Sequence, residues 1–455
     1  MAETESATEP GAASRAALPQ DEPAILVRPP GPHSRTWLTR ESVATAPMGQ
    51  RRMPEITPGI QADVPPGSIV YATAAGSNVF DVDGNRYVDL CAGFGAQLLG
   101  HRHPHVERVL LLQAARLWQA LGDVYPGDAK IALSERLAKL HPSGQGRVIL
   151  GLSGADAVSA ALKTAALYTG KSGVLAFGAS YHGLSHGPLA ACGLRESYRL
   201  PFAPQLNPHV AFLPFPEDDA SAARVLQQTR EQLALGALGA VLIEPILGRG
   251  GCIVPPSAFL GELFQLSREH DALSIADEIW TGLGRSGQLL VSEAAVPDLI
   301  CLGKGLGGGL PISACIGSRE VMQSWSREAE VVHTSTFAGA PLACATALAT
   351  LDVLSRERLA ERSAAVGARF VERLRQALPS RFAVRGQGLM IGVDTGGRVG
   401  GAQRIQRALL EQGYIVSSGG GGREVLILTP PLTIAVALLD GFVAALAGTL
   451  QAFEP

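Results

Sequence analysis

The chain has 455 residues, of which 46% are hydrophobic and 17% are charged, and its formal net charge is −3 at pH 7. This length is enough for a large domain and a smaller one, and the composition is that of an ordinary globular protein. The nearly balanced charge gives no indication of a nucleic-acid partner or of a membrane surface. Six cysteines are scattered along the chain without a C-x-x-C pair, so we expect neither a bound metal nor a disulfide framework.

The N-terminal residues 1–33 are predicted to be a disordered tail, because their Ala, Pro and Glu content offers little apolar surface to bury. No signal peptide is visible, and the acidic residues do not fit a basic transit peptide, so we expect a cytoplasmic protein. Near the other end, the apolar stretch Ala435–Leu450 is interrupted by Asp440 and Gly441 and is too short to span a bilayer. We therefore expect a packed C-terminal helix and no membrane partner.

Three further segments are distinguished by their patterns of apolar residues. Residues 34–90 contain NVFDVDGNRYVDL, which is typical of a β-hairpin with an Asp-Gly turn, and are expected to join the smaller domain. Residues 91–345 alternate short β-branched runs with segments of helical spacing, which predicts an α/β domain with a largely parallel sheet covered by helices on both faces. Helical segments and short strands over residues 346–455 predict a separate α+β domain. Ligands of a parallel sheet bind beyond the carboxyl ends of its strands, so residues at these ends are the candidates for a site.

Two motifs that follow predicted strands are candidates for binding an anion and a flat ring. In GLSGADAVSAALKTA, Ser153 can cap a helix and Gly154 lets a ligand approach its exposed N–H groups, although any well-capped helix can start in this way. In SYHGLSHG, Tyr181 could stack on a flat ring, and a packed loop aromatic is an equally good explanation. His182 could be a base or a metal ligand, but no second ligand stands at helical spacing.

The acidic pair Asp277 and Glu278 ends the apolar run LSIADEI. Neighbours on a strand point to opposite faces, so one carboxylate can face a ligand while the other pairs elsewhere. A buried carboxylate costs several kcal/mol unless it is paired, so we expect a cationic partner, either a metal or a pyridinium. A purely structural ion pair is the competing explanation.

Lys304 stands in GKGLGGGLP at the end of the next predicted strand. A Walker A loop requires its glycines before the lysine and Ser or Thr after it, so this motif is not a phosphate loop. A lysine desolvated at a strand end has a lowered pKa and is a nucleophile towards aldehydes, and flanking glycines leave room for a bulky adduct. An anion site, a stacking aromatic, a carboxylate and a nucleophilic lysine together describe pyridoxal phosphate better than any other ligand.

The sequence resembles the class III, or omega-type, aminotransferases, which are pyridoxal-phosphate enzymes of fold type I. The resemblance extends over roughly residues 34 to 445 and rests on motifs that occur in order, among them DVDGNRYVDL, LSGADAVSAALK, YHG, IEPILGRGG, DEIWTGLGRSG, GKGLGGGLP, HTSTFAGAPLACA and PPLTI. It implies a large domain with a mainly parallel seven-stranded sheet sandwiched by helices, plus a smaller α+β domain. It also implies a homodimer with shared active sites.

The resemblance gives roles to the residues around the cofactor ring. Lys304 would form the Schiff base and carry the proton, and Asp277 would keep the pyridine nitrogen protonated. Ile279 and Tyr181 would pack on the two faces of the ring, and His182 would support the site.

The resemblance also assigns residues that hold the cofactor from further away. Gly154 and Ala155 would cradle the phosphate, and Glu244 would support the acid pair and the cofactor region. Thr336 would reach the phosphate of the neighbouring subunit, which requires a dimer.

Departures from the family pattern fall where substrates bind. Arg249 stands where many members have a glutamate, and Ile427 stands where they have the arginine that pairs with it. Arg249 could supply a carboxylate clamp from the opposite wall, because arginine binds carboxylates bidentately. Alternatively, Arg249 is a surface residue and the pocket takes substrates without a carboxylate there. Trp280 could narrow the pocket or belong to the core.

The sequence therefore predicts an aminotransferase that uses pyridoxal phosphate to move an amino group from an amino acid or amine donor to an oxo acid or aldehyde by a ping-pong mechanism. An amino-acid epimerase or aminomutase on the same fold stays open, because Lys304 and Asp277 serve both chemistries. A non-catalytic binding protein on this fold is disfavoured by the intact lysine and aspartate.

Overall fold

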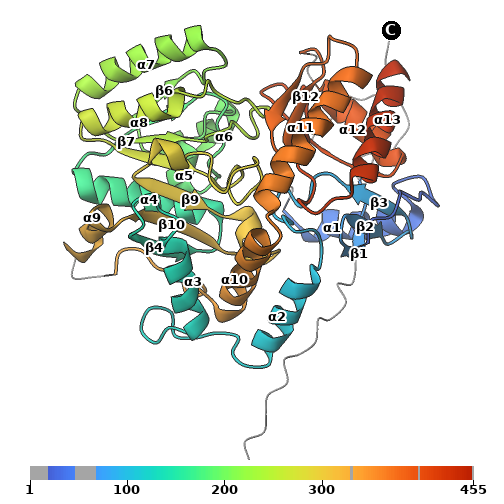
Figure 1. The fold of residues 1–455 in the computed structure, drawn as a ribbon, viewed down its shortest axis with the longest axis horizontal. Coiled ribbons are helices and arrows are strands. Elements are labelled where there is room, and N and C mark those ends of the chain that lie inside the picture. The colour runs from blue at the N-terminus through green and yellow to red at the C-terminus, as the bar shows by residue number, and fades with distance from the viewer. Residues whose placement is uncertain (1–18, 47–67, 328–330, 398–399, 453–455) are drawn as a thin grey trace, which may run out of the picture.

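The structure is a computed structural model that describes residues 19–46, 68–327, 331–397 and 400–452. Its elements form two lobes that lie side by side, with the seven-stranded sheet in one lobe and the strands β1 to β3 and β12 in the other (Figure 1). Helix α10 (Pro341–Arg356) packs on α2 (Pro104–Ala114) and α3 (Asp128–Ala138) at the base of the larger lobe.

The sheet of the larger lobe has the strand order β4-β10-β9-β8-β7-β5-β6. Its strands are β4 (Gly146–Gly151), β5 (Gly173–Phe177), β6 (Val210–Leu213), β7 (Leu238–Ile243), β8 (Leu273–Asp277), β9 (Leu299–Leu302) and β10 (Ser313–Ser318). The pairs are parallel except for those of β10, which runs antiparallel to both of its neighbours. The expected α/β architecture with a largely parallel sheet is confirmed.

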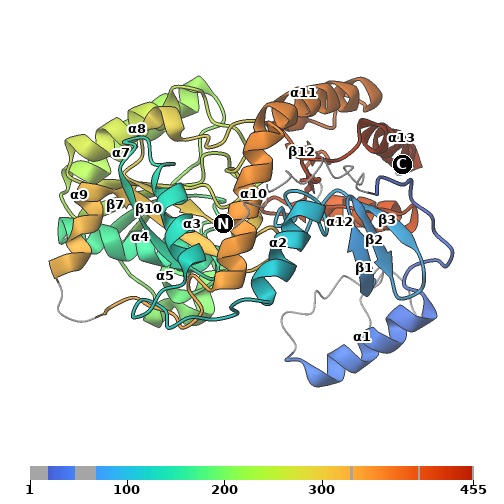
Figure 2. The same cartoon turned by 60° about the horizontal axis from the view of Figure 1, so that its bottom comes forward.

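Helices cover both faces of this sheet because its strands are apolar on both sides. Along β5, Val174 and Ala176 pack in one core with α4 (Gly154–Thr169), whereas Leu175 and Phe177 pack in another core with α7 (Asp219–Ala234) and α8 (Phe259–Glu269). Figure 2 shows α7 and α8 on one side of the strands and α4 on the other. The shorter helices of this lobe are α5 (His186–Ala190), α6 (Glu196–Arg199) and α9 (Arg319–Met322).

The smaller lobe contains two four-stranded sheets. One has the order β1-β2-β3-β13 and the other β11-β12-β15-β14. The strands are β1 (Tyr71–Ala75), β2 (Asn78–Asp81), β3 (Arg86–Asp89), β11 (Val384–Gln387), β12 (Met390–Asp394), β13 (Tyr414–Ile415), β14 (Ser417–Gly419) and β15 (Val425–Leu428). The helices are α1 (Pro32–Ala44), α11 (Leu359–Ala377), α12 (Gly401–Glu411) and α13 (Val436–Ala452). The predicted hairpin is present as β2 and β3, and β3 pairs with β13, so residues from both ends of the chain share one sheet.

The N-terminal segment that the sequence predicts to be disordered is described only in part. Residues 1–18 lie outside the described residues. Beyond them, the backbone N–H groups of Asp21 and Leu26 donate to the side-chain oxygens of Asn78 and Asn85 at 2.9 and 2.7 Å. The hydrogen-bonded chain therefore begins before residue 33, because two asparagines of the hairpin supply backbone partners that composition does not reveal. The predicted domain boundaries at residues 90 and 345 stay predictions.

The apolar C-terminal stretch forms α13, and Leu438, Phe442 and Leu446 are buried, as expected for a packed helix. No helix in the described ranges is long and apolar enough to cross a membrane. The cytoplasmic location stays a prediction from the sequence.

Candidate functional site

Three neighbouring strands bring the candidate residues of the larger lobe to one edge of the sheet. β7, β8 and β9 are parallel neighbours, and Glu244, Asp277 and Lys304 stand at or just beyond their carboxyl ends. Parallel strands end at the same edge, so residues far apart in the sequence meet there.

Lys304 begins the short 3-10 helix η3 (Lys304–Gly307) directly after Gly303. Its φ of 38° is unusual for a residue with a side chain, and such conformations cluster at functional sites. Burial lowers the pKa of its amine to about 8, while the carboxylates of Asp277 and Glu244 act in the opposite direction. A fraction of the amine is therefore neutral and nucleophilic near neutral pH.

Asp277 and His182 form a buried pair beside the lysine. Oδ2 of Asp277 lies 2.7 Å from Nδ1 of His182, and Oδ1 accepts the backbone N–H of Ile279 at 3.2 Å. A carboxylate at this distance places the imidazole proton on Nδ1. Nε2 of His182 is buried and has no hydrogen-bond partner among the described residues. The pair is therefore rigid, and one polar atom in it is left for a ligand.

Two further carboxyl groups are buried here, and burial raises the pKa of both. Glu244 accepts the N–H groups of Tyr181 at 2.6 Å and Gly248 at 2.9 Å, so it ties the loop after β5 to the loop after β7. Glu278 accepts from the hydroxyl of Thr281 and from the N–H and hydroxyl of Ser292. The expected cationic partner is wrong for Glu278, because uncharged donors satisfy it and its raised pKa favours the neutral acid.

The N-terminus of α4 faces the same site. Ser153 Oγ accepts the N–H of Asp156 at 3.2 Å and the carboxylate of Asp156 accepts the N–H of Ser153 at 3.1 Å, which forms a capping box. The N–H groups of Gly154 and Ala155 belong to the first turn, which has no partners within the helix. A Cβ added to Gly154 would lie 2.9 Å from Cδ1 of Ile279, so a larger residue here would push the isoleucine side chain aside. The capped helix is confirmed, and the anion site at its first turn stays a prediction.

Arg249 lies against Tyr181. Its guanidinium carbon is 4.5 Å from the centre of the tyrosine ring, and both side chains are half-buried. The charge of Arg249 also lowers the pKa of Lys304, so the guanidinium lies within electrostatic reach of the amine. Among the described residues, no carboxylate forms a salt bridge with it. The alternative in which Arg249 is a surface residue does not fit this position.

Ile427 and Trp280 belong to one apolar wall. The members of this cluster are Ile246, Cys252, Trp280, Met390, Val425 and Ile427. Ile427 is 1% exposed, so it completes packing where the resemblance expects an arginine. Trp280 is part of this core and also contacts the lysine, because Nζ of Lys304 lies 4.4 Å from the centre of its ring.

Thr336 is exposed, and its hydrogen bond is with a residue outside the group around Lys304. Its carbonyl oxygen accepts from Nε2 of Gln119 at 2.6 Å, so the segment around it packs beside the segment that precedes α3. Thr336 is therefore the one predicted site residue for which the structure gives no contact with the group around Lys304.

The rim of the site includes residues that the sequence did not indicate. Arg195 donates to the carbonyl oxygens of Gly420 and Gly421, both at 3.1 Å, and the N–H of Gly420 donates to the carbonyl of Arg249 at 2.8 Å. The glycine run SSGGGG before β15 was the only local signal for this turn, which holds the backbone of Arg249 in place.

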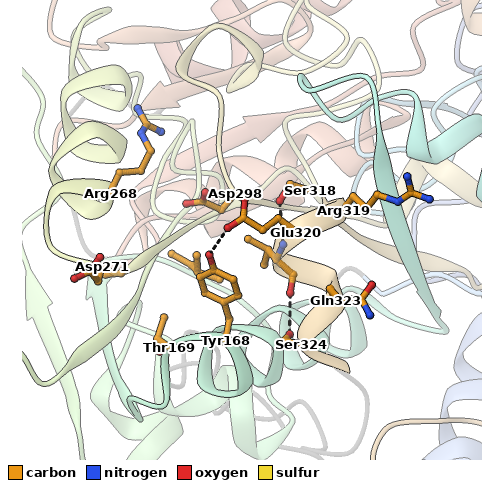
Figure 3. A pocket seen from close by; sticks show the side chains of 13 residues that line it. Tyr168, Thr169, Arg268, Asp271, Asp298, Ser318, Arg319, Glu320, Gln323 and Ser324 are labelled. Atoms are coloured by element: carbon orange, nitrogen blue, oxygen red, sulfur yellow. Dashed lines mark hydrogen bonds between the residues drawn. The ribbon is translucent and has the colours of Figure 1, made fainter. Parts of the chain in front are cut away.

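A cavity of about 1040 Å³ lies at the other edge of the sheet (Figure 3). Its lining includes Leu273 at the start of β8, Asp298 just before β9 and Ser318 at the end of the antiparallel β10. The hydroxyl of Tyr168 donates to Glu320 at 2.9 Å in its wall. These residues mark the amino ends of the parallel strands, opposite to Lys304, so the cavity is not part of the site.

Known protein families and relatives match most of this chain. The sequence model of the aminotransferase class-III family matches residues 60–450. The chain is 35% identical over 380 residues to acetylornithine aminotransferase of Methanothermobacter thermautotrophicus. This alignment covers 82% of this chain and 92% of the relative. It is 34% identical over 431 residues to 4-aminobutyrate aminotransferase of Mycobacterium tuberculosis, with 87% and 93% covered.

Solved structures of aminotransferases have a similar fold over most of this chain. An amine transaminase from an uncultivated Pseudomonas species, solved with pyridoxal phosphate bound, superposes with a TM-score of 0.80 at 29% identity and covers 90% of this chain and 98% of its own. The ornithine aminotransferase of Toxoplasma gondii superposes with a TM-score of 0.77 at 29% identity, with 87% and 92% covered.

Proposed function

Because the chain belongs to the class-III aminotransferase family, which makes it a pyridoxal-phosphate-dependent aminotransferase of fold type I, we propose that Lys304 is its Schiff-base lysine. The observation that carries the proposal is a half-buried lysine with a lowered pKa beside the buried pair of Asp277 and His182. Nothing among the relatives favours the epimerase or aminomutase alternative.

The residues around Lys304 fit pyridoxal phosphate. The N–H groups of Gly154 and Ala155 suit a phosphate, because a helix N-terminus attracts anions. The carboxylate of Asp277 suits a pyridinium nitrogen. Ile279 and Tyr181 supply an apolar and an aromatic surface on which a flat ring can pack.

Pyridoxal phosphate, when bound, supplies an electron sink for the electron pair that is released when a C–H bond beside the amino group breaks. Lys304 then acts as the base, because its amine is partly neutral at physiological pH, and it returns the proton as an acid. Asp277, held in place by His182, supplies the fixed negative charge. Glu244 fixes the backbone on which Tyr181 stands.

We further propose that Arg249 binds a carboxylate of the substrate. Its guanidinium has no carboxylate partner in the described chain and lies on Tyr181 within electrostatic reach of Lys304. The relatives are named for acetylornithine and 4-aminobutyrate, both of which carry a carboxylate. The donor is therefore an amino acid whose carboxylate reaches Arg249, and the acceptor is an oxo acid or aldehyde.

Substitution of Arg249 separates this role from packing on Tyr181. We expect Arg249→Ala to lower kcat/KM for amino acids by about 10²-fold, the value of one lost charge-assisted contact, and to leave simple amines nearly unaffected. Arg249→Lys should restore part of the loss, and Arg230→Ala, which removes an exposed charge elsewhere, should change neither. An equal loss on amino acids and simple amines would refute the assignment.

We propose that the protein is a homodimer whose sites are shared, so that Thr336 contacts the cofactor phosphate bound by the partner. The segment before α3 and the segment around Thr336 expose large apolar side chains on one surface, namely Trp118, Leu121, Val124, Tyr125, Val331 and Phe337. Monomeric proteins seldom expose so many together, and a second copy of the chain would cover them.

A donor-only experiment tests the reaction itself. Purified holoenzyme mixed with an amino acid and no oxo acid should convert its cofactor once, to the amine form, and then stop. Continued turnover of the amino acid without an acceptor would indicate an epimerase or aminomutase instead. Absorbance of the bound cofactor and chromatography of the amino acid measure the two outcomes.

A further inference from the structure

The amine of Lys304 lies over the face of an aromatic ring that no assigned step uses. Nζ is 4.4 Å from the centre of the Trp280 indole, which is within the range at which a cation is attracted to a π face. Tryptophan provides the strongest such attraction among the aromatic residues. The contact is therefore energetically significant for the protonated amine.

Trp280 is held in a fixed position. Its side chain is 7% exposed and belongs to the apolar wall with Met390. A Cβ added to Gly95 would lie 2.5 Å from Nε1 of the indole, and one added to Gly248 would lie 2.6 Å from Cε3. Glycine at both positions therefore leaves the space in which the ring lies, and a side chain at either position would displace it.

Three charged groups act on the amine electrostatically. Asp277 at the end of β8 and Glu244 beyond β7 attract the ammonium, and Arg249 in the loop after β7 repels it. The indole face adds an uncharged surface that attracts the ammonium at short range.

We propose that Trp280 is a positioning residue that holds the amine of Lys304 against its indole face when the lysine is free of the cofactor and carries a proton. The inference rests on the proposed role of Lys304. Its consequence is that the amine, once it has taken up a proton, keeps a defined direction until it returns that proton. A lysine on a long flexible side chain would otherwise sample many rotamers and lose its orientation.

The experiment titrates Lys304 in the full-length protein loaded with pyridoxamine 5′-phosphate, in which the cofactor already carries its amine and the lysine is free. Acetic anhydride labels neutral amines, and mass spectrometry of the peptide that contains Lys304 gives the labelled fraction at each pH. Loss of the indole face disfavours the ammonium, so Trp280→Leu should move the labelling midpoint of Lys304 down by about half to one pH unit.

Two further variants separate the cation–π contact from packing. Trp280→Phe keeps an aromatic face of weaker attraction, so its shift should be smaller than that of Trp280→Leu. Met390→Leu alters the same apolar wall without removing a ring, so it should cause no shift. An unchanged midpoint in Trp280→Leu, an equal shift in Trp280→Phe, or an equal shift in Met390→Leu would each overturn the inference. Failure of the wild-type protein to bind pyridoxamine phosphate would instead refute the proposed function.

Discussion

At Lys304, burial and the neighbouring carboxylates shift the pKa of one amine in opposite directions, and burial is the larger effect. The pKa of about 8 in the folded protein is below the ordinary value of 10.5. Below pH 8 the amine is charged in the folded and the unfolded states, so the full cost of burying the charge is present; above pH 10.5 it is neutral in both, and the cost is absent.

This difference predicts a pH-dependent gain in stability for Lys304→Met. In the cofactor-free protein the gain should reach up to about 3 kcal/mol below pH 8 and disappear as the pH rises to about 10.5. Thermal midpoints measured across this range test the prediction. Lys163→Met, at an exposed position, serves as the control and should show no such trend. A gain that is the same at every pH would mean that burial of charge is not the cause.

The contact between His182 and Asp277 predicts a second effect at the scale of a single residue. His182→Phe removes the donor at 2.7 Å and leaves a carboxylate that is 4% exposed, whose one remaining hydrogen-bond partner within the described ranges is the N–H of Ile279. We expect a loss of about 1–3 kcal/mol in stability and a weaker affinity for the cofactor. His182→Asn places an amide near the position of Nδ1 and should recover part of both. Thermal unfolding and titration of the cofactor-free protein with pyridoxal phosphate measure these effects. Equal stability and equal cofactor affinity in the two variants would contradict a role for the hydrogen bond between His182 and Asp277.

At the scale of elements, the start of α4 combines a structural and a binding role. Ser153→Ala removes one half of the capping box and should cost about 1 kcal/mol, whereas Ser153→Thr should keep most of the cap. Because the N–H groups that would hold the phosphate belong to the same turn, we expect the cofactor affinity of Ser153→Ala to fall together with the thermal midpoint. Fluorescence titration with pyridoxal phosphate measures this, and an unchanged affinity in a destabilised variant would separate the two roles.

The elements show what the sequence can and cannot reveal. Strands such as β5 and β8 are predictable because each is a continuous apolar run buried on both faces. The antiparallel direction of β10 and the two-residue strand β13 are not predictable, because pairing with distant strands decides them rather than local composition.

The same distinction applies to the site. Lys304 and Asp277 are identifiable from residue type and position at strand ends. The contacts among the other candidates are not, because that of Trp280 with Lys304 and that of Arg249 with Tyr181 join loops that the folded sheet brings together. Glu278 illustrates the limit, since a buried acid predicts a cation while the structure provides hydroxyl and amide donors.

At the scale of the whole molecule, the exposed position of Thr336 supports the proposal that it reaches the cofactor of a partner subunit. It is exposed on the surface that also carries Trp118 and Tyr125, which are 68% and 71% exposed. One chain thus has the lysine at the strand ends and the threonine on an apolar outer surface. The proposed dimer, in which each threonine completes the other subunit's site, would account for both.

Heterodimers purified through two different affinity tags test this sharing. When one subunit carries Lys304→Ala and the other Thr336→Glu, a shared site leaves one lysine paired with one native threonine, and we expect about half of the wild-type activity. When one subunit carries both substitutions and the other carries neither, the remaining lysine faces the altered threonine, and activity should be nearly lost. If Thr336 instead acts within its own chain, the two results are exchanged, because the first heterodimer has no intact chain and the second has one. Activity per mole of heterodimer, compared with the two parent homodimers, decides between these arrangements without assuming which side chain touches the phosphate.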